Sequence, residues 1–138
     1  MLAPGTIGDD GLVNQPSIGE PQLVLTTRRI GTVTVLSVRG ELDLTNLSQF
    51  ERYADGVLES DPTGLIIDLT DSNFLASMGI TVLIRLSWRS ADRVGFAVVA
   101  HSGVMARRFE LLGLLDVLAV HREMDQALAS VTSMPPMP

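Results

Sequence analysis

Two kinds of hydrophobic pattern follow one another along the chain. Residues 23–30 and 32–39 are rich in Val, Leu and Thr, alternate in polarity and flank Gly31, which predicts two antiparallel strands joined by a tight turn. Almost continuous apolar runs are typical of strands covered on both faces. Such runs, together with one shorter one, predict three further strands at residues 65–69, 95–100 and 117–120.

Between these runs, apolar residues recur at helical spacing. The predicted helices cover residues 46–60, 77–91, 102–112 and 122–131. Thr45 or Asn46 can cap the first helix, Ser102 the third, and Gly113 ends the third. The order ββαβαβαβα predicts an α/β fold with a mixed, mainly parallel five-stranded sheet, packed with about four helices through right-handed crossovers.

The chain has 138 residues, which is the size of one domain. Residues 1–21 are rich in Pro, Gly and Asp and contain few apolar residues, so we expect a disordered leader. The folded unit is predicted at residues 22–132. Residues 133–138 are expected to form a disordered tail.

Composition excludes several classes of function. The chain has no cysteine, so disulfides, thiolate zinc sites and Cys nucleophiles are excluded. A net charge of −6 argues against nucleic-acid binding. Without a signal peptide or an apolar run of about 18 residues, no membrane contact is expected, and the default is a cytoplasmic monomer. The two histidines have no nearby ligands and no phosphate-binding glycine motif is present, so no metal or cofactor is predicted.

Polar residues at the predicted carboxyl ends of strands mark the candidate site, because function in open α/β sheets gathers there. Two segments qualify, residues 40–46 and 68–79. Asp68, inside an apolar run, is read as a structural carboxylate bonded to nearby loop N–H groups. Asp43 either stabilises the start of the first helix or lines a partner site.

Ser77, at the predicted start of the second helix, allows three interpretations. It can be a simple N-cap. It can be the serine of a nucleophile elbow, although Leu75 stands where that motif has glycine. The acid and base candidates for such a hydrolase are Asp116, His101 and His121. It can also be a phosphoacceptor, since a helix N-terminus tolerates a phosphate that changes the surface charge by about −1.5 to −2.

The second helix has one face that is predicted to pack on the sheet, formed by Ile80, Leu83, Ile84, Ser87 and Ala91. The opposite face carries Met78, Val82, Arg85 and Arg89. Met and Arg are enriched at interfaces, so this face is either a binding surface or is partly covered by the first helix. In the third helix, Arg107 and Arg108 indicate a solvated face or a minor anion patch.

Three stretches in the right order and spacing resemble the STAS domain, and within it the bacterial anti-sigma factor antagonists. They are the turn at residues 38–43 with Gly-Glu-Leu-Asp, the segment 65–80, and the motif at 108–114. The family motif Asp-Ser-Ser-Gly or Asp-Ser-Thr-Gly is here Ala76-Ser77-Met78-Gly79, so the hydroxyl is kept while Ala76 and Met78 depart from the pattern.

The resemblance implies a STAS-type fold and a role in partner switching. The unmodified domain would bind an anti-sigma factor, often a serine kinase of the GHKL type, and so release a sigma factor. The kinase would phosphorylate Ser77, and a serine phosphatase would restore the binding form. This is a binding role and not an enzymatic one. The expected partner-binding residues are Asp43, Thr45, Asn46, Phe74, Ala76, Ser77, Met78, Gly79, Val82, Arg85 and Arg89.

Two alternatives stay open from the sequence. The domain can be an accessory subunit of a transporter or of a stress-sensing assembly without phospho-control. More remotely, it can be a small serine hydrolase that uses Ser77.

Overall fold

The computed structural model describes residues 23–132. The predicted leader at 1–21 and tail at 133–138 lie outside the described residues. Within the described part, the predicted order ββαβαβαβα is confirmed. The strands are β1 (Val24–Ile30), β2 (Val33–Leu42), β3 (Gly64–Leu75), β4 (Gly95–Val99) and β5 (Val120–His121). The helices are α1 (Leu47–Glu59), α2 (Ser77–Ser90), α3 (Gly103–Leu111) and α4 (Met124–Thr132).

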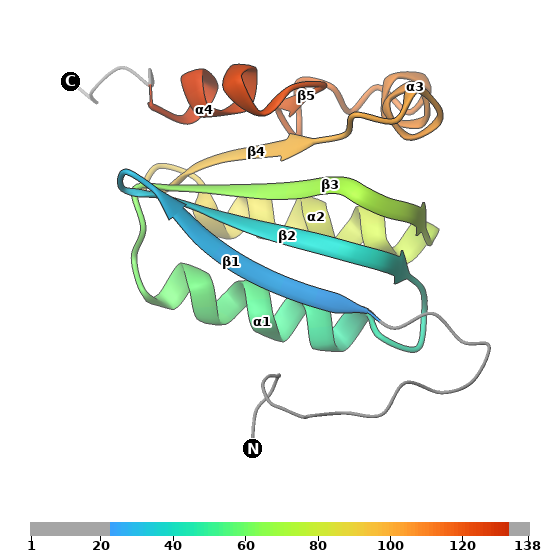
Figure 1. Cartoon of the computed structure of the whole chain (residues 1–138), viewed down its shortest axis with the longest axis horizontal. Helices are drawn as coiled ribbons and strands as arrows, with labels where there is room; N and C mark the ends of the chain where they lie inside the picture. Colours follow the sequence, from blue (N-terminus) through green and yellow to red (C-terminus); the bar gives the residue numbers. More distant parts are fainter. Residues whose placement is uncertain (1–22, 133–138) are drawn as a thin grey trace.

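The strands form a single mixed sheet in the order β1-β2-β3-β4-β5 (Figure 1). β1 pairs with β2 in the antiparallel sense, and the remaining neighbours are parallel. Gly31 makes the hairpin turn with a φ of 63°, a left-handed conformation that glycine adopts without steric cost. Because β2, β3 and β4 are parallel, they all end at the same edge of the sheet.

β3 is longer than predicted, because it continues past residue 69 to Leu75. It stays paired with β2 as far as the Leu42–Leu75 pair, with register shifts near Ser37 and Gly40. Leu69, Ser72 and Leu75 are buried along this extension while polar residues between them face solvent. The end of β3 thus carries the chain directly to the first turn of α2.

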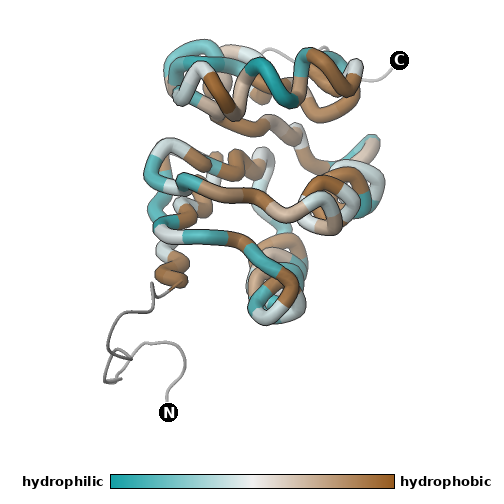
Figure 2. Tube along the Cα trace, turned by 90° about the vertical axis from the view of Figure 1, so that its right-hand side faces the viewer, coloured by the Kyte–Doolittle hydropathy of each residue, from teal (hydrophilic) through white to brown (hydrophobic). Residues whose placement is uncertain are grey.

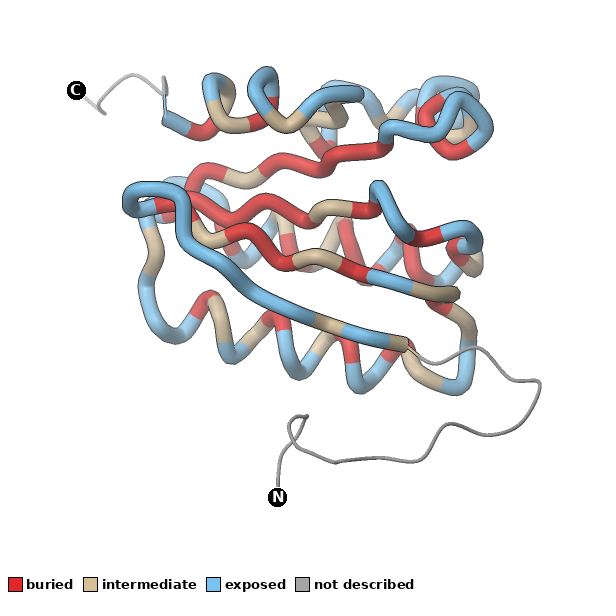
Figure 3. The backbone as a smooth tube through the Cα atoms, in the orientation of Figure 1, coloured by how far each residue is buried: buried red, intermediate tan, exposed pale blue. Residues whose placement is uncertain are grey.

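Helices cover both faces of the sheet and enclose two hydrophobic clusters. Residues of α1, α2 and α3 pack against one face of the sheet and form the larger cluster with it, in which Leu36, Ile67 and Leu83 are fully buried. α4 covers the other face, where Ala127 and Val131 pack against the strands. Figure 3 shows this burial in the middle strands, whereas the edge strand β1 is mostly exposed.

The last strand differs from its prediction. β5 contains only Val120 and His121, not residues 117–120. The preceding apolar residues form turns, in which Leu118 N–H bonds to the carbonyl of Leu114 and Ala119 has a φ of 49°. The apolar run reflects burial of Leu118 in the core and not an extended strand.

Among the described residues, no helix combines the length and the apolarity that crossing a bilayer requires. The one tryptophan, Trp88, lies near the carboxyl end of α2 and is 69% exposed.

Candidate functional site

The site lies at the edge where β2, β3 and β4 end, which is the edge seen in Figure 2. Ala76 leads from β3 into α2 with extended backbone angles, and its N–H bonds to the carbonyl of Leu42 at 2.8 Å. Ala76 is the N-cap and has no side-chain acceptor, so no side-chain hydrogen bond caps this helix. The interpretation of Ser77 as the N-cap is therefore wrong, since Ser77 is the first helical residue.

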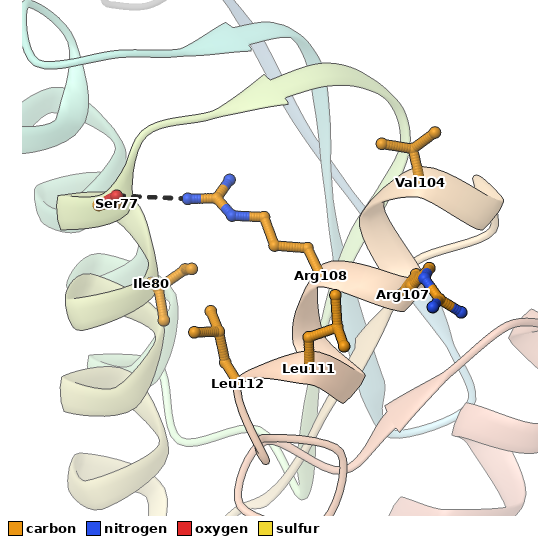
Figure 4. A pocket seen from close by; sticks show the side chains of 7 residues that line it. All are labelled: Ser77, Ile80, Val104, Arg107, Arg108, Leu111 and Leu112. Atoms are coloured by element: carbon orange, nitrogen blue, oxygen red, sulfur yellow. Dashed lines mark hydrogen bonds between the residues drawn. The ribbon is translucent and has the colours of Figure 1, made fainter.

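Ser77 is exposed, and its hydroxyl is not used to satisfy the N–H groups of its own helix. Its side-chain contact comes from α3: Arg108 Nη2 lies 3.5 Å from Ser77 Oγ, a long hydrogen bond. Arg108 Nη1 donates to the carbonyl of Leu75, the last residue of β3. Figure 4 shows the guanidinium reaching from α3 across to the start of α2.

Exposed apolar side chains surround this hydroxyl. A hollow of about 650 Å³ beside Ser77 is lined by Ile80, Val104, Arg107, Arg108, Leu111 and Leu112 (Figure 4). Leu111 is 72% exposed and Leu112 54% exposed, and Phe74 and Met78 are each about half exposed. Large apolar side chains gathered at one edge are typical of a surface that binds another protein. We call the set Phe74, Ser77, Met78, Leu111 and Leu112 the docking surface.

Asp43, Thr45 and Asn46 form a bonded turn where β2 ends. Asp43 Oδ1 accepts hydrogen bonds from Thr45 Oγ1 at 2.6 Å and from Thr45 N at 2.9 Å. These bonds lower the pKa of the Asp43 carboxyl from its ordinary value, so its negative charge is favoured. Asn46 is the N-cap residue of α1, but its side chain bonds back to Asp43 N–H and to the carbonyl of Glu41. The turn is thus held in shape next to the start of α2.

Val82 was expected among the partner-binding residues, and this expectation is wrong, because Val82 is only 2% exposed. The buried side of α2 includes Val82, Leu83 and Leu86, since the helix packs on the sheet and also on α1. On this face, coverage by the first helix is therefore observed for Val82 but not for Met78, which is 49% exposed.

Arg85 and Arg89 share this position, and both guanidinium groups are held by carboxylates of α1. Arg85 donates to both carboxylate oxygens of Glu51, at 2.9 and 2.8 Å. Arg89 donates to Glu51 at 3.0 Å and to Asp55 at 2.7 Å. These arginines join the two helices and lie outside the docking surface, and their expected role in partner binding stays a prediction.

Gly79 is also buried, and its role is one of packing. A Cβ at this position would lie 2.4 Å from Leu75 Cδ1 and 3.4 Å from Leu47 Cδ2. The absence of a side chain therefore allows α2 to start directly against the end of β3. The expected partner contact through Gly79 is corrected accordingly.

The geometry required of a serine hydrolase is not found in the described part of the chain. His101 Nδ1 lies 3.1 Å from the carbonyl oxygen of Arg122 and 3.5 Å from Glu123. His121 Nε2 is buried without a hydrogen-bond partner among residues 23–132. Neither histidine is hydrogen-bonded to Ser77, so neither is placed to act as its general base.

Asp68 behaves as the sequence predicts. Its Oδ1 accepts hydrogen bonds from Thr70 N at 3.0 Å and from Thr70 Oγ1 at 2.5 Å. Within residues 23–132, no three or more His, Asp or Glu side chains lie close enough together to hold a metal ion.

Comparison with known proteins places this site in a family. The family model of the STAS domain matches residues 24–127 of this chain. The chain belongs to the STAS domain family. It is 35% identical over 99 residues to RsfB of Mycobacterium tuberculosis, an anti-sigma-F factor antagonist, and the match covers 72% of this chain and 81% of RsfB.

Solved structures of other proteins share this fold. The crystal structure of an anti-sigma factor antagonist from Mycobacterium paratuberculosis superposes with a TM-score of 0.75 at 29% identity, covering 80% of this chain and 95% of that one. The murine anion transporter Slc26a9 superposes with a TM-score of 0.63 at 18% identity, over 77% of this chain and 18% of the transporter. The second likeness shows the fold alone.

The resemblance seen in the sequence is thus confirmed, and the site residues that it implies stay a prediction. Leu111, Leu112 and the reach of Arg108 toward Ser77 were not predicted. One signal was present: α3 carries apolar residues on both its buried and its exposed sides, since Val104 and Leu111 are exposed while Met105 and Phe109 are buried.

Proposed function

We propose that this protein is an anti-sigma factor antagonist that acts in the cytoplasm by binding an anti-sigma factor through the docking surface. The observation that carries the proposal is the exposed hydroxyl of Ser77 at the first turn of α2, set among exposed apolar side chains. The similarity to RsfB supports the choice of partner class. The role is one of binding and release.

Phosphorylation of Ser77 is the proposed off-switch. A GHKL-type serine kinase, which is the anti-sigma factor itself, adds the phosphate, and a serine phosphatase removes it. Two unit charges 4 Å apart interact by about 4 kcal/mol at an effective dielectric constant of 20. A phosphate facing one partner carboxylate under partial screening would cost about 2–4 kcal/mol, or roughly 30- to 1,000-fold in affinity.

Binding of GHKL-type anti-sigma factors from the genome that encodes this chain tests the proposal. Isothermal titration calorimetry should detect a complex with the unmodified protein, and Ser77→Glu should weaken it at least tenfold. Ser77→Ala keeps the surface neutral and should bind like the wild type. Ser60→Glu adds the same charge at the carboxyl end of α1, the end that lies away from the docking surface. As the control for added charge, it should bind like the wild type.

Two results would contradict the proposal in different ways. Equal binding by the wild type and Ser77→Glu would remove the phosphate switch but leave the binding role. Failure of every anti-sigma factor to bind, with recovery of a membrane transporter from the same cells, would favour an accessory subunit. The fold shared with Slc26a9 makes that second role the one to compare.

A further inference from the structure

Arg108, like most arginines of the described part of the chain, has no carboxylate partner, but its guanidinium is hydrogen-bonded to the end of β3. Arg85, Arg89 and Arg93 each lie within 3.5 Å of a carboxylate oxygen. Arg108 forms no ion pair among residues 23–132, although the whole chain carries a net charge of −6. Arg108 is half-buried, and within residues 23–132 its guanidinium donates to two neutral acceptors, the carbonyl of Leu75 and the hydroxyl of Ser77.

The guanidinium is also fixed in place by the fold. It lies between two hollows, the one beside Ser77 and a second of about 480 Å³ formed with the end of β3. Nη1 is engaged by the last carbonyl of β3, while Nη2 is directed at Ser77 Oγ from 3.5 Å away. A guanidinium held at that separation leaves space for phosphoryl oxygens, which are its preferred acceptors.

We propose that Arg108 is the residue that binds the phosphate on Ser77, so that the phosphate is held against α3 by a hydrogen-bonded ion pair. This inference rests on the proposed phosphorylation of Ser77. In that reaction, the Ser77 Oγ–P bond forms, the bond from the γ-phosphorus to the bridging oxygen of ATP breaks, and ADP leaves with the electron pair. The hydroxyl proton passes to a base of the kinase.

The ion pair has two consequences for the switch. First, it directs the phosphate over the hollow lined by Ile80 and Leu112, so the modification covers apolar surface that a partner would otherwise contact. Second, a guanidinium beside the phosphate lowers the second pKa of the phosphate, so the modified side chain stays a dianion to lower pH. Arg108 is thus a positioning residue for the modified side chain.

Phosphorus NMR on protein with phosphoserine introduced at position 77 during translation tests this directly, without kinase or anti-sigma factor. Free phosphoserine has a second pKa of about 6. We expect the phosphate in the wild type to titrate below that value, and Arg108→Gln to raise its pKa by about 0.5–1 unit. Arg108→Lys, which keeps the charge, should restore part of the shift.

Arg107→Gln is the matched control. Arg107 neighbours Arg108 in α3 and lines the same hollow, but its side chain points away from Ser77 in Figure 4, so its loss should raise the phosphate pKa less than the loss of Arg108 does. Charged groups on the neighbouring elements include Asp71, which lines the second hollow with Arg108, and Asp43 at the end of β2. Both carboxylates are present in every variant, so the difference between variants isolates Arg108.

A second measurement needs no arginine variant. In nitrogen-15 spectra of the wild type, the Arg108 Nε–H signal should shift when position 77 carries phosphoserine and should not shift when it carries serine over the same pH range. Identical phosphate titrations in the wild type and Arg108→Gln, or an unchanged Arg108 signal, would overturn the inference. A failure of the kinase to modify Ser77 would instead refute the proposed switch, and the two failures are therefore distinguishable.

Discussion

Replacing Gly79 with alanine should destabilise the protein, although alanine is the better helix former. Gly79 lies in the first turn of α2, and an added Cβ would stand 2.4 Å from Leu75 Cδ1. Leu75 is 1% exposed and Leu47, on the other side, is 7% exposed. The methyl group of Leu75 therefore has little free space into which it can move.

The sign follows from comparing two magnitudes. Glycine to alanine inside a helix gains at most about 1 kcal/mol, and less in a first turn. Forcing an extra carbon into a packed core costs about 1–3 kcal/mol. We expect Gly79→Ala to lower the free energy of unfolding by about 1–2 kcal/mol, which lowers the melting temperature by roughly 4–10 °C for a domain of this size.

Urea unfolding followed by circular dichroism measures this change, with Gly56→Ala as the control. Gly56 lies in α1, and a Cβ there would meet no atom within 4 Å. Gly56→Ala should therefore stabilise the protein by about 0.5–1 kcal/mol. If both substitutions stabilise it equally, the close contact between α2 and the end of β3 is absent, and the packing role of Gly79 is refuted.

Three further outcomes follow from the helix contacts. Glu51→Gln should lower the free energy of unfolding by about 1 kcal/mol, because Arg85 loses its charged partner. The control Glu59→Gln, at an exposed position, should change the free energy of unfolding little. Equal urea midpoints of the two variants would contradict this. Hydrogen bonds from Arg85 lower the pKa of Glu51, so its stabilisation is present above the ordinary glutamate pKa and is lost as the pH falls through the folded-state value. The difference between wild type and Glu51→Gln should accordingly shrink in acid unfolding curves. Gly95→Ala should destabilise the protein by about 1–3 kcal/mol in thermal melts, since its Cβ would lie 2.9 Å from the carbonyl oxygen of Val131; an unchanged melting temperature would argue against direct packing of α4 on β4.

The sheet was predictable because its central strands are buried on both faces. Residues 65–67 are all buried, as their continuous apolar run predicts. The extension of β3 to Leu75 was not, since Thr70, Asp71 and Asn73 are polar and face solvent there, and polar residues in sequence resemble a loop.

The orientation of α2 was predicted only in part. A helical wheel assumes one direction of burial, but α2 contacts both the sheet and α1, so Val82 and Leu86 are buried together with Ile80 and Leu83. The wheel shows that Arg85 lies away from the sheet. It cannot show that Glu51, 34 residues earlier, accepts its hydrogen bonds.

The candidate site was located by Ser77 and completed by the structure. Placement of Ser77 at the start of a helix follows from local pattern, and the family resemblance gives it a role. The contact with Arg108 spans 31 residues and depends on how α3 lies against the end of β3, which no local pattern specifies. For the same reason, an isolated Arg-Arg pair in the sequence did not indicate a partner for Ser77.

The exposed indole near the far end of α2 makes the protein its own fluorescent reporter of how much surface a partner covers. Trp88 follows Ser77 by eleven positions in the helix, about 16 Å along the axis, and ion pairs to α1 hold the intervening turns. A contact limited to the region around Ser77 should leave the emission of Trp88 unchanged. A blue shift on mixing would mean that the bound molecule extends along the whole length of the helix.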